Sequence, residues 1–301
     1  MKKTTLKNIT LTAAVACMLA APNAQAIDWV SGQVGDWSVG SNWDGGSLPT
    51  LSTLARFGSG AGAGDAGGEE ASINGIAALA DRFIIGQNTP NPTFTSKVYL
   101  NSGSLTTDST TQHRIGQSSE GWLTVNGGTL DIQNAGYSSD AGGRLIVNGG
   151  DVNIGGISTV GGSSAGFLEV NGTGMTIDVT GNYNFGAFGT AIFTLDSTLA
   201  GVGVVNNSAI LNLNATSTLT VDFRGYDFSA NKGSDIVLFD YGTLGGVGAD
   251  TFGTINFIGG FGELDYTTGG QIRLLSVVPE PSSTALLGLG GLALMLRRKR
   301  S

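Results

Sequence analysis

The stretch "GWLTVNGGTLDI", residues 121–132, decides the fold because three other stretches of the chain can be aligned with it. These are "SKVYLNSGSLTT" from Ser96, "GRLIVNGGDVNI" from Gly143 and "GFLEVNGTGMTIDV" from Gly166. The four copies share one asparagine, with spacings of 25, 22 and 23 residues, at Asn101, Asn126, Asn148 and Asn171. Self-similarity at a period of this size is typical of a solenoid or an array of repeats.

Within each copy the apolar residues alternate with polar ones. Leu123 and Val125 are expected on one side of the strand and Thr124 on the other, and Leu130 and Ile132 resume the pattern after Asn-Gly-Gly. This alternation indicates strands with one buried face. The turn between them needs residues that tolerate positive φ, and Asn and Gly do so.

Two architectures can use such units. In a parallel β-helix each copy is one coil, whereas in an antiparallel β-sandwich each Asn-Gly-Gly is a hairpin turn. A unit of 22 to 25 residues fits three short strands with three turns, so we predict an all-β parallel β-helix, with the sandwich as the alternative. The four asparagines then form a turn ladder in which each amide bonds to the next coil. A simple turn preference would place asparagine there too.

The repeat region is flanked by segments of different composition. We divide the chain into a signal peptide (1–26), an N-terminal cap with a Gly-rich loop (27–68), the repeat β-helix (69–205), a C-terminal β region (206–277) and a sorting signal with a short transmembrane segment (278–301). The C-terminal β region is either the last coils or a small β cap over them, because a solenoid needs its open ends covered.

Three of the four tryptophans, Trp29, Trp37 and Trp43, lie in the predicted N-terminal cap. Large aromatic side chains are suited to covering the open end of a solenoid, and a sugar-stacking platform is the functional alternative. The run "WSVGSNW" followed by Pro49 resembles the opening of autotransporter-like and adhesin-like β-helix proteins. That resemblance implies the same architecture for the body.

The N-terminus has the three parts of a secretory signal peptide. Positive charges come first, an apolar run from Ile9 to Ala21 follows, and Ala24 and Ala26 form an A-x-A cleavage site. Signal peptidase and the general export machinery are therefore expected partners. Cys17, the single cysteine, offers a weaker lipoprotein-type alternative. Cleavage after Ala26 leaves a mature chain without disulfides, thiol nucleophiles or cysteine metal ligands.

The body of the protein is strongly acidic. Eight Lys and Arg remain between the two terminal segments against all 23 Asp and Glu, which gives a formal net charge of −15. A surface of this charge repels nucleic acid, so we expect no nucleic-acid partner. Gly accounts for 50 of 301 residues, far above the usual ~7%, as expected for many short strands joined by tight turns.

Catalytic and metal-binding motifs are weak in this sequence. His113 is the only histidine, which excludes paired-histidine metal sites, and we expect it in a solvent-facing position at a strand start. "GGVGADTFG", residues 245–253, matches one copy of a calcium-binding nonapeptide, which makes Asp250 a weak metal candidate. We predict no catalytic residue and no cofactor. The alternative is a carbohydrate-active β-helix enzyme, a polysaccharide lyase or hydrolase.

The C-terminus carries the clearest functional signal. Val278, Pro279, Glu280 and Pro281 precede an apolar run, and a positive stop cluster follows, consisting of Arg297, Arg298, Lys299 and Arg300. This order resembles the PEP-CTERM sorting signal of Gram-negative bacteria. The resemblance implies an exosortase-type membrane protease as a partner, and cargo tied to exopolysaccharide, biofilm or floc formation.

The length of the apolar run is consistent with a temporary anchor. Its 13 residues, 284–296, span about 20 Å as a helix, short of the ~30 Å hydrocarbon core. The positive cluster stays on the cytoplasmic side. A permanent single-span anchor is the alternative. We therefore predict an exported protein with a transient inner-membrane anchor, delivered to the cell surface as a structural or adhesive matrix protein, with exopolysaccharide as a candidate partner.

Overall fold

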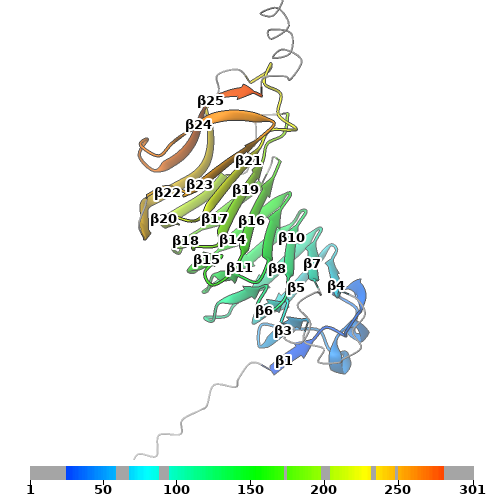
Figure 1. The fold of residues 1–301 in the computed structure, drawn as a ribbon. Helices are drawn as coiled ribbons and strands as arrows, with labels where there is room; N and C mark the ends of the chain where they lie inside the picture. The colour runs from blue at the N-terminus through cyan, green and yellow to red at the C-terminus, as the bar shows by residue number, and fades with distance from the viewer. Residues whose placement is uncertain are drawn as a thin grey trace, which may run out of the picture.

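The computed structural model describes residues 25–58, 68–87, 95–172, 175–197, 204–231, 235–247 and 250–280. Over these residues the chain forms a parallel β-helix, with coils stacked along one axis from β1 at one end to β25 at the other (Figure 1). The predicted all-β solenoid is confirmed. The sandwich alternative is wrong because strands of neighbouring coils pair in parallel.

Three ladders of parallel strands, named faces A, B and C, enclose the core of the described solenoid. Face C comprises β2 (Val34–Asp36), β4 (Glu70–Ile73), β7 (Ser96–Leu100), β10 (Gly121–Val125), β13 (Gly143–Val147), β16 (Gly166–Asn171), β19 (Gly189–Thr194), β21 (Thr218–Asp222) and β23 (Thr254–Ile258). Face B begins with β5 (Ile76–Ala80), β8 (Gly103–Thr107), β11 (Thr129–Ile132), β14 (Gly150–Ile154) and β17 (Met175–Val179).

Face A has the shortest strands. It comprises β1 (Gln25–Asp28), β3 (Thr53–Phe57), β6 (Arg82–Ile85), β9 (His113–Ile115), β12 (Tyr137–Ser139), β15 (Ser158–Val160) and β18 (Tyr183–Phe185). The long strand β20 (Val204–Asn214) pairs first with β17 and then with β18, so it belongs to faces B and A in turn. The strand β22 (Ile236–Val247) follows β20 along both faces.

The parallel coils therefore continue beyond residue 205 and end in an antiparallel unit. Strand β25 (Gln271–Pro279) pairs antiparallel with both β22 and β24 (Gly260–Asp265). These strands lie at the end of the solenoid opposite β1 (Figure 1). Residues 206–277 thus contain further parallel coils followed by a terminal antiparallel unit.

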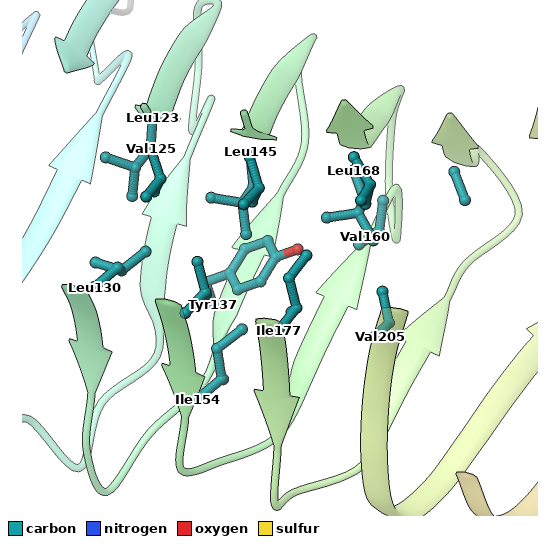
Figure 2. Close-up of a cluster of buried hydrophobic side chains, with 14 of the residues drawn as sticks. Leu123, Val125, Leu130, Tyr137, Leu145, Ile154, Val160, Leu168, Ile177 and Val205 are labelled. Carbon is teal, nitrogen blue, oxygen red and sulfur yellow. The ribbon is translucent and has the colours of Figure 1, made fainter. Parts of the chain in front are cut away.

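The core is built from columns of equivalent residues. Leu123 aligns with Leu145 and Leu168, and all three are fully buried (Figure 2). Val125 aligns in the same way with Val147. Thr124 points outward as the alternation predicts, but it is only 6% exposed because it lies in register between Tyr99 and Ile146. Outward positions on face C are thus partly covered by their neighbours.

The turns between faces C and B depend on glycine. Gly103, Gly128 and Gly150 have φ of 85°, 76° and 78°, which a side chain rarely adopts. They are also stacked closely, because a Cβ built on Gly128 would lie 2.3 Å from the carbonyl oxygen of Gly103. Glycine at this corner therefore allows both the turn and the close approach of neighbouring coils.

The N-terminal end is closed by aromatic rings. Between β2 and β3 the chain passes through the 3-10 segments η1 (Gly40–Asn42) and η2 (Asp44–Gly46). Trp29, Trp37 and Trp43 are each 1% exposed and pack within 5.8 Å, ring centre to ring centre, of Phe57 in β3. The sugar-stacking interpretation is wrong because the rings are covered and cannot present a face to a ligand.

A charge placed in the valine column tests the register. Val147→Asp buries an unpaired carboxylate and should cost several kcal/mol of unfolding free energy, a large part of the 5–15 kcal/mol typical of a domain. Thr190→Asp, at an outward and partly exposed position of the same face, is the control and should change stability little. Chemical denaturation measures both variants, and equal losses would contradict the register.

Candidate functional site

A row of amides runs along the corner between faces C and B. Asn126 Nδ2 donates to Asn101 Oδ1 (2.8 Å), Asn148 to Asn126 (2.8 Å) and Asn171 to Asn148 (2.9 Å). The row continues toward the N-terminus, where Asn101 donates to Asn74 (3.0 Å) and Asn74 donates to the carboxylate of Asp36 (2.9 Å). Each coil is thereby bonded to the next at an exposed edge.

Asp36 terminates this row because a carboxylate can only accept. Its pKa is lowered from the ordinary value by the hydroxyl of Ser38 first and by the amide of Asn74 second. The period of the asparagines was visible in the sequence, whereas Asn74 and Asp36 fall outside the clearest copies of the repeat. The row is exposed and fully polar, and its hydrogen bonds are used between coils.

Face B presents short polar side chains to solvent. Equivalent outward positions on successive coils carry Thr106, Asp131, Asn153, Asp178, Asn206 and Asp240. Asn206 Nδ2 donates to Asp178 Oδ1 at 2.8 Å. Alternating amides and carboxylates limit repulsion between neighbouring acids.

Face C carries a stacked row of charged and aromatic side chains, named here the cation–aromatic row. Its members occupy equivalent positions in successive strands, at Glu70, Lys97, Trp122, Arg144 and Phe167. Lys97 Nζ lies 5.4 Å and Arg144 Cζ 5.7 Å from the Trp122 ring centre, and Arg144 Cζ lies 4.0 Å from that of Phe167. Each contact is within cation–π range.

The two cations of this row are also paired with carboxylates. Lys97 Nζ lies 2.6 Å from Glu70 Oε1, and this bond raises the pKa of Lys97. Arg144 forms an ion pair with Glu169. The sequence analysis did not identify this row. Its signal was present, since the equivalent position in the four copies holds Lys, Trp, Arg and Phe in turn. The row offers aromatic, cationic and anionic groups on one flat sheet face.

His113 does begin a strand, β9, but the expectation that it faces solvent is wrong. Its side chain is fully buried, with Nδ1 accepting from the Phe83 backbone N–H (3.2 Å) and Nε2 within 3.2 Å of Thr107 Oγ1. Because Nδ1 accepts, the neutral ring carries its proton on Nε2 and donates to Thr107. Burial first, and the positive charge of Arg82 second, lower the pKa of His113 to about 3.

The calcium candidate is divided between two structural segments. Residues 245–247 of the nonapeptide belong to β22, where they pair with β20. Asp250 lies beyond the undescribed residues 248 and 249. Within the described ranges, no group of three or more His, Cys, Asp or Glu is placed to hold a metal ion. Asp250 therefore stays an untested candidate.

The predicted signal-peptide junction meets the first strand of face A. Ala24 lies outside the described residues, whereas Ala26 is in β1 opposite Leu54. Cleavage after Ala26 would leave Ile27 and Asp28 of this strand. Asp28 bonds Arg56 through both carboxylate oxygens (2.5 and 2.7 Å), so the new N-terminus would still be tied to β3.

The first three residues of the sorting motif lie at the end of the fold. Val278 and Pro279 belong to β25 and are opposite Phe261 and Gly260 of β24. Glu280 Oε1 accepts from the backbone N–H of Gly259 at 3.2 Å. Pro281 and the positive cluster Arg297, Arg298, Lys299 and Arg300 lie outside the described residues.

A family model described as the PEP-CTERM protein-sorting motif matches residues 277–300. The chain carries a PEP-CTERM sorting signal. The resemblance of the tail to this signal is thereby confirmed, and it implies export, membrane-anchored sorting and processing by an exosortase-type membrane protein. The match covers the tail and leaves the body to be interpreted from its structure. No curated protein and no solved structure matches the chain.

Among the described residues, which stop short of the predicted transmembrane segment, no helix has the length and apolarity needed to cross a membrane. The described body thus offers three surfaces for interpretation, namely the amide row, face B and the cation–aromatic row. The sorting motif stands apart from them at one end of the solenoid (Figure 1).

Burial of His113 predicts a specific sensitivity to acid. The folded pKa of about 3 lies below the ordinary 6.5, so between these values the unfolded chain binds a proton that the folded chain does not. The unfolding free energy should therefore decrease as the pH is lowered through this window, by at most about 1.4 kcal/mol per pH unit. Denaturation at pH 7 and pH 4.5 measures the fall.

His113→Gln is the matched variant, because its amide can accept and donate in the same pocket without titrating. It should lose less stability than the parent protein between the two pH values. Carboxylates elsewhere contribute equally to both proteins, so the difference isolates His113. Parallel losses would contradict a buried neutral ring.

Proposed function

We propose that the protein is a structural or adhesive matrix component, delivered to the cell surface by an exosortase-type system and associated with exopolysaccharide in a biofilm. The observation that carries the proposal is the position of a PEP-CTERM signal directly at the end of a rigid solenoid. A solenoid presents extended, regular faces, which suit contact with an extended polymer.

The outward rows support an adhesive role. The cation–aromatic row places the ring of Trp122 between the cations Lys97 and Arg144 on the two adjacent coils. Their carboxylate partners, Glu70 and Glu169, lie one coil further in each direction. The exposed edges of aromatic rings contact the apolar C–H groups of sugars, and Arg and carboxylate groups bond sugar hydroxyls or acidic substituents. Face B adds hydroxyl, amide and carboxylate groups along its length.

The runner-up is a carbohydrate-active enzyme, and the distribution of charges favours the matrix role over it. A lyase needs a basic residue beside carboxylates that gather in a cleft. On face B, the carboxylates Asp131, Asp151 and Asp178 lie on strands β11, β14 and β17. None of the strands β5, β8, β11, β14 and β17 contains Lys or Arg. The basic side chains Lys97 and Arg144 lie on face C, already paired with Glu70 and Glu169.

Delivery is tested by changing the tail. Glu280→Ala, or deletion of residues 297–300, should leave the protein retained or misprocessed in the envelope, because the motif or the stop cluster is lost. Glu263→Ala, which removes a carboxylate from the same hairpin outside the motif, is the control and should be delivered normally. Surface fractionation with intact mass measures both, and unchanged delivery of the tail variants would refute the sorting role.

Adhesion is tested at the cation–aromatic row. Trp122→Ala should weaken binding to the purified exopolysaccharide about tenfold, the equivalent of about 1.4 kcal/mol. Thr190→Ala, two coils beyond Arg144 on the same row, is the control and should bind as the parent protein does. Co-sedimentation measures binding, and thermal melting verifies that both variants are folded. Equal affinity of all three proteins would place the adhesive surface elsewhere.

A further inference from the structure

Exposed apolar side chains occur on the last strands of the fold, from which the sorting tail departs. We define the end patch as the exposed residues Ile255, Ile258, Phe261 and Val278, which are 40, 39, 47 and 51% exposed. They come from β23, β24 and β25, the last three strands of the fold (Figure 1). Large apolar side chains exposed together mark an interaction site more often than single ones do.

The patch is exposed because the stack of coils ends there. Ile255 continues an inward column of face C, where its register neighbour Leu219 is fully buried. Strand β23 is the last strand of its ladder, so nothing in that ladder covers its outer edge. Ile255 and Ile258 both lie along this edge, with side chains on opposite faces of the strand. Phe261 and Val278 are opposite each other in an antiparallel pair, which places both side chains on one face of the hairpin.

The sorting tail leaves the fold from within this patch. Val278 is itself a member, Pro279 is still opposite Gly260, and Glu280 is bonded to the Gly259 N–H. Thr284, where the apolar run begins, lies four residues after Glu280. Four residues span at most about 14 Å. An inserted run therefore holds Glu280, two residues after Val278 of the end patch, within this distance of the point where the chain enters the lipid.

We propose that the end patch lies against the lipid surface of the membrane while the tail holds the chain there. The inference rests on the membrane-held stage of the proposed function. Burying the four side chains at the boundary between headgroups and acyl chains removes apolar area from water. The short segment between Glu280 and Thr284, called here the tether, keeps the patch at a high local concentration near the lipid, which such a small patch needs in order to bind.

The surrounding charges make the contact dependent on the tether. Glu263, Asp265 and Glu280 lie in the same terminal unit, and the body is acidic as a whole, so the free protein is repelled by anionic lipid. Cutting the tail near the sorting motif would therefore release the body. The patch orients the solenoid during processing and has no affinity that would hold it afterwards.

A second copy of the chain is the rival occupant. Val30, Val34 and Val39 are exposed at the opposite end of the solenoid, so an end-to-end contact could also cover the patch. The tether favours the membrane because every held chain has lipid within reach of its own patch, whatever its concentration. The experiment therefore has to separate lipid from protein as the covering surface.

The test uses the full chain with Cys17→Ser, expressed in cells that lack the exosortase-type protease, followed by isolation of the inner membrane. One variant carries Phe261→Cys and the other Phe188→Cys, a phenylalanine of comparable exposure (56%) between β18 and β19. Both are labelled with an environment-sensitive fluorophore. Nitroxide-labelled phospholipid is then added as a quencher that acts only at lipid contact.

Quenching at position 261 should exceed that at position 188 several-fold. Equal quenching, with the protein still in the membrane fraction, overturns this inference and leaves the sorting role intact. A blue-shifted label at position 261 that lipid nitroxide does not quench overturns it in favour of a second copy. Absence of the chain from the membrane fraction overturns both this inference and the membrane-held stage on which it rests.

Discussion

One constraint underlies the whole molecule, namely that each strand residue must be compatible with its own equivalent one coil away. Parallel pairing without register shift sets Val125 on Val147 and Asn126 beside Asn148. Apolar residues tolerate this self-stacking through burial, and amides tolerate it because each has a donor and an acceptor. Carboxylates do not, which explains why face B alternates acid with amide and why Asp36 stands only at the end of its row.

The fold could be predicted because this constraint makes equivalent positions in successive coils carry similar residues. Faces B and C carry the repeat clearly, so the period, the strand directions and the register of residues 121–132 could all be predicted. The register of face A could not be predicted in this way. Its strands are only three residues long in the central coils, and its inward positions hold residues as different as His113, Tyr137 and Ser158.

His113 was misplaced for this reason. A lone polar residue in a weakly repeated segment is ordinarily exposed, and only its pairing with Thr107 and the Phe83 N–H makes burial tolerable. The cation–aromatic row was missed for the opposite reason. Its positions repeat faithfully while their chemistry changes from Lys97 to Trp122 to Arg144, and the resulting contacts between unlike neighbours follow only from the three-dimensional register.

The same register has a consequence for how the chain reaches its folded state during export. Each central strand finds its partner 22 to 25 residues further along, as Val125 finds Val147, so pairing needs only short loops to close. A chain emerging N-terminus first can use the tryptophan-capped end as a template and add one coil at a time. Such stepwise addition would let the coils fold in the order in which they are exported, with the tail following last.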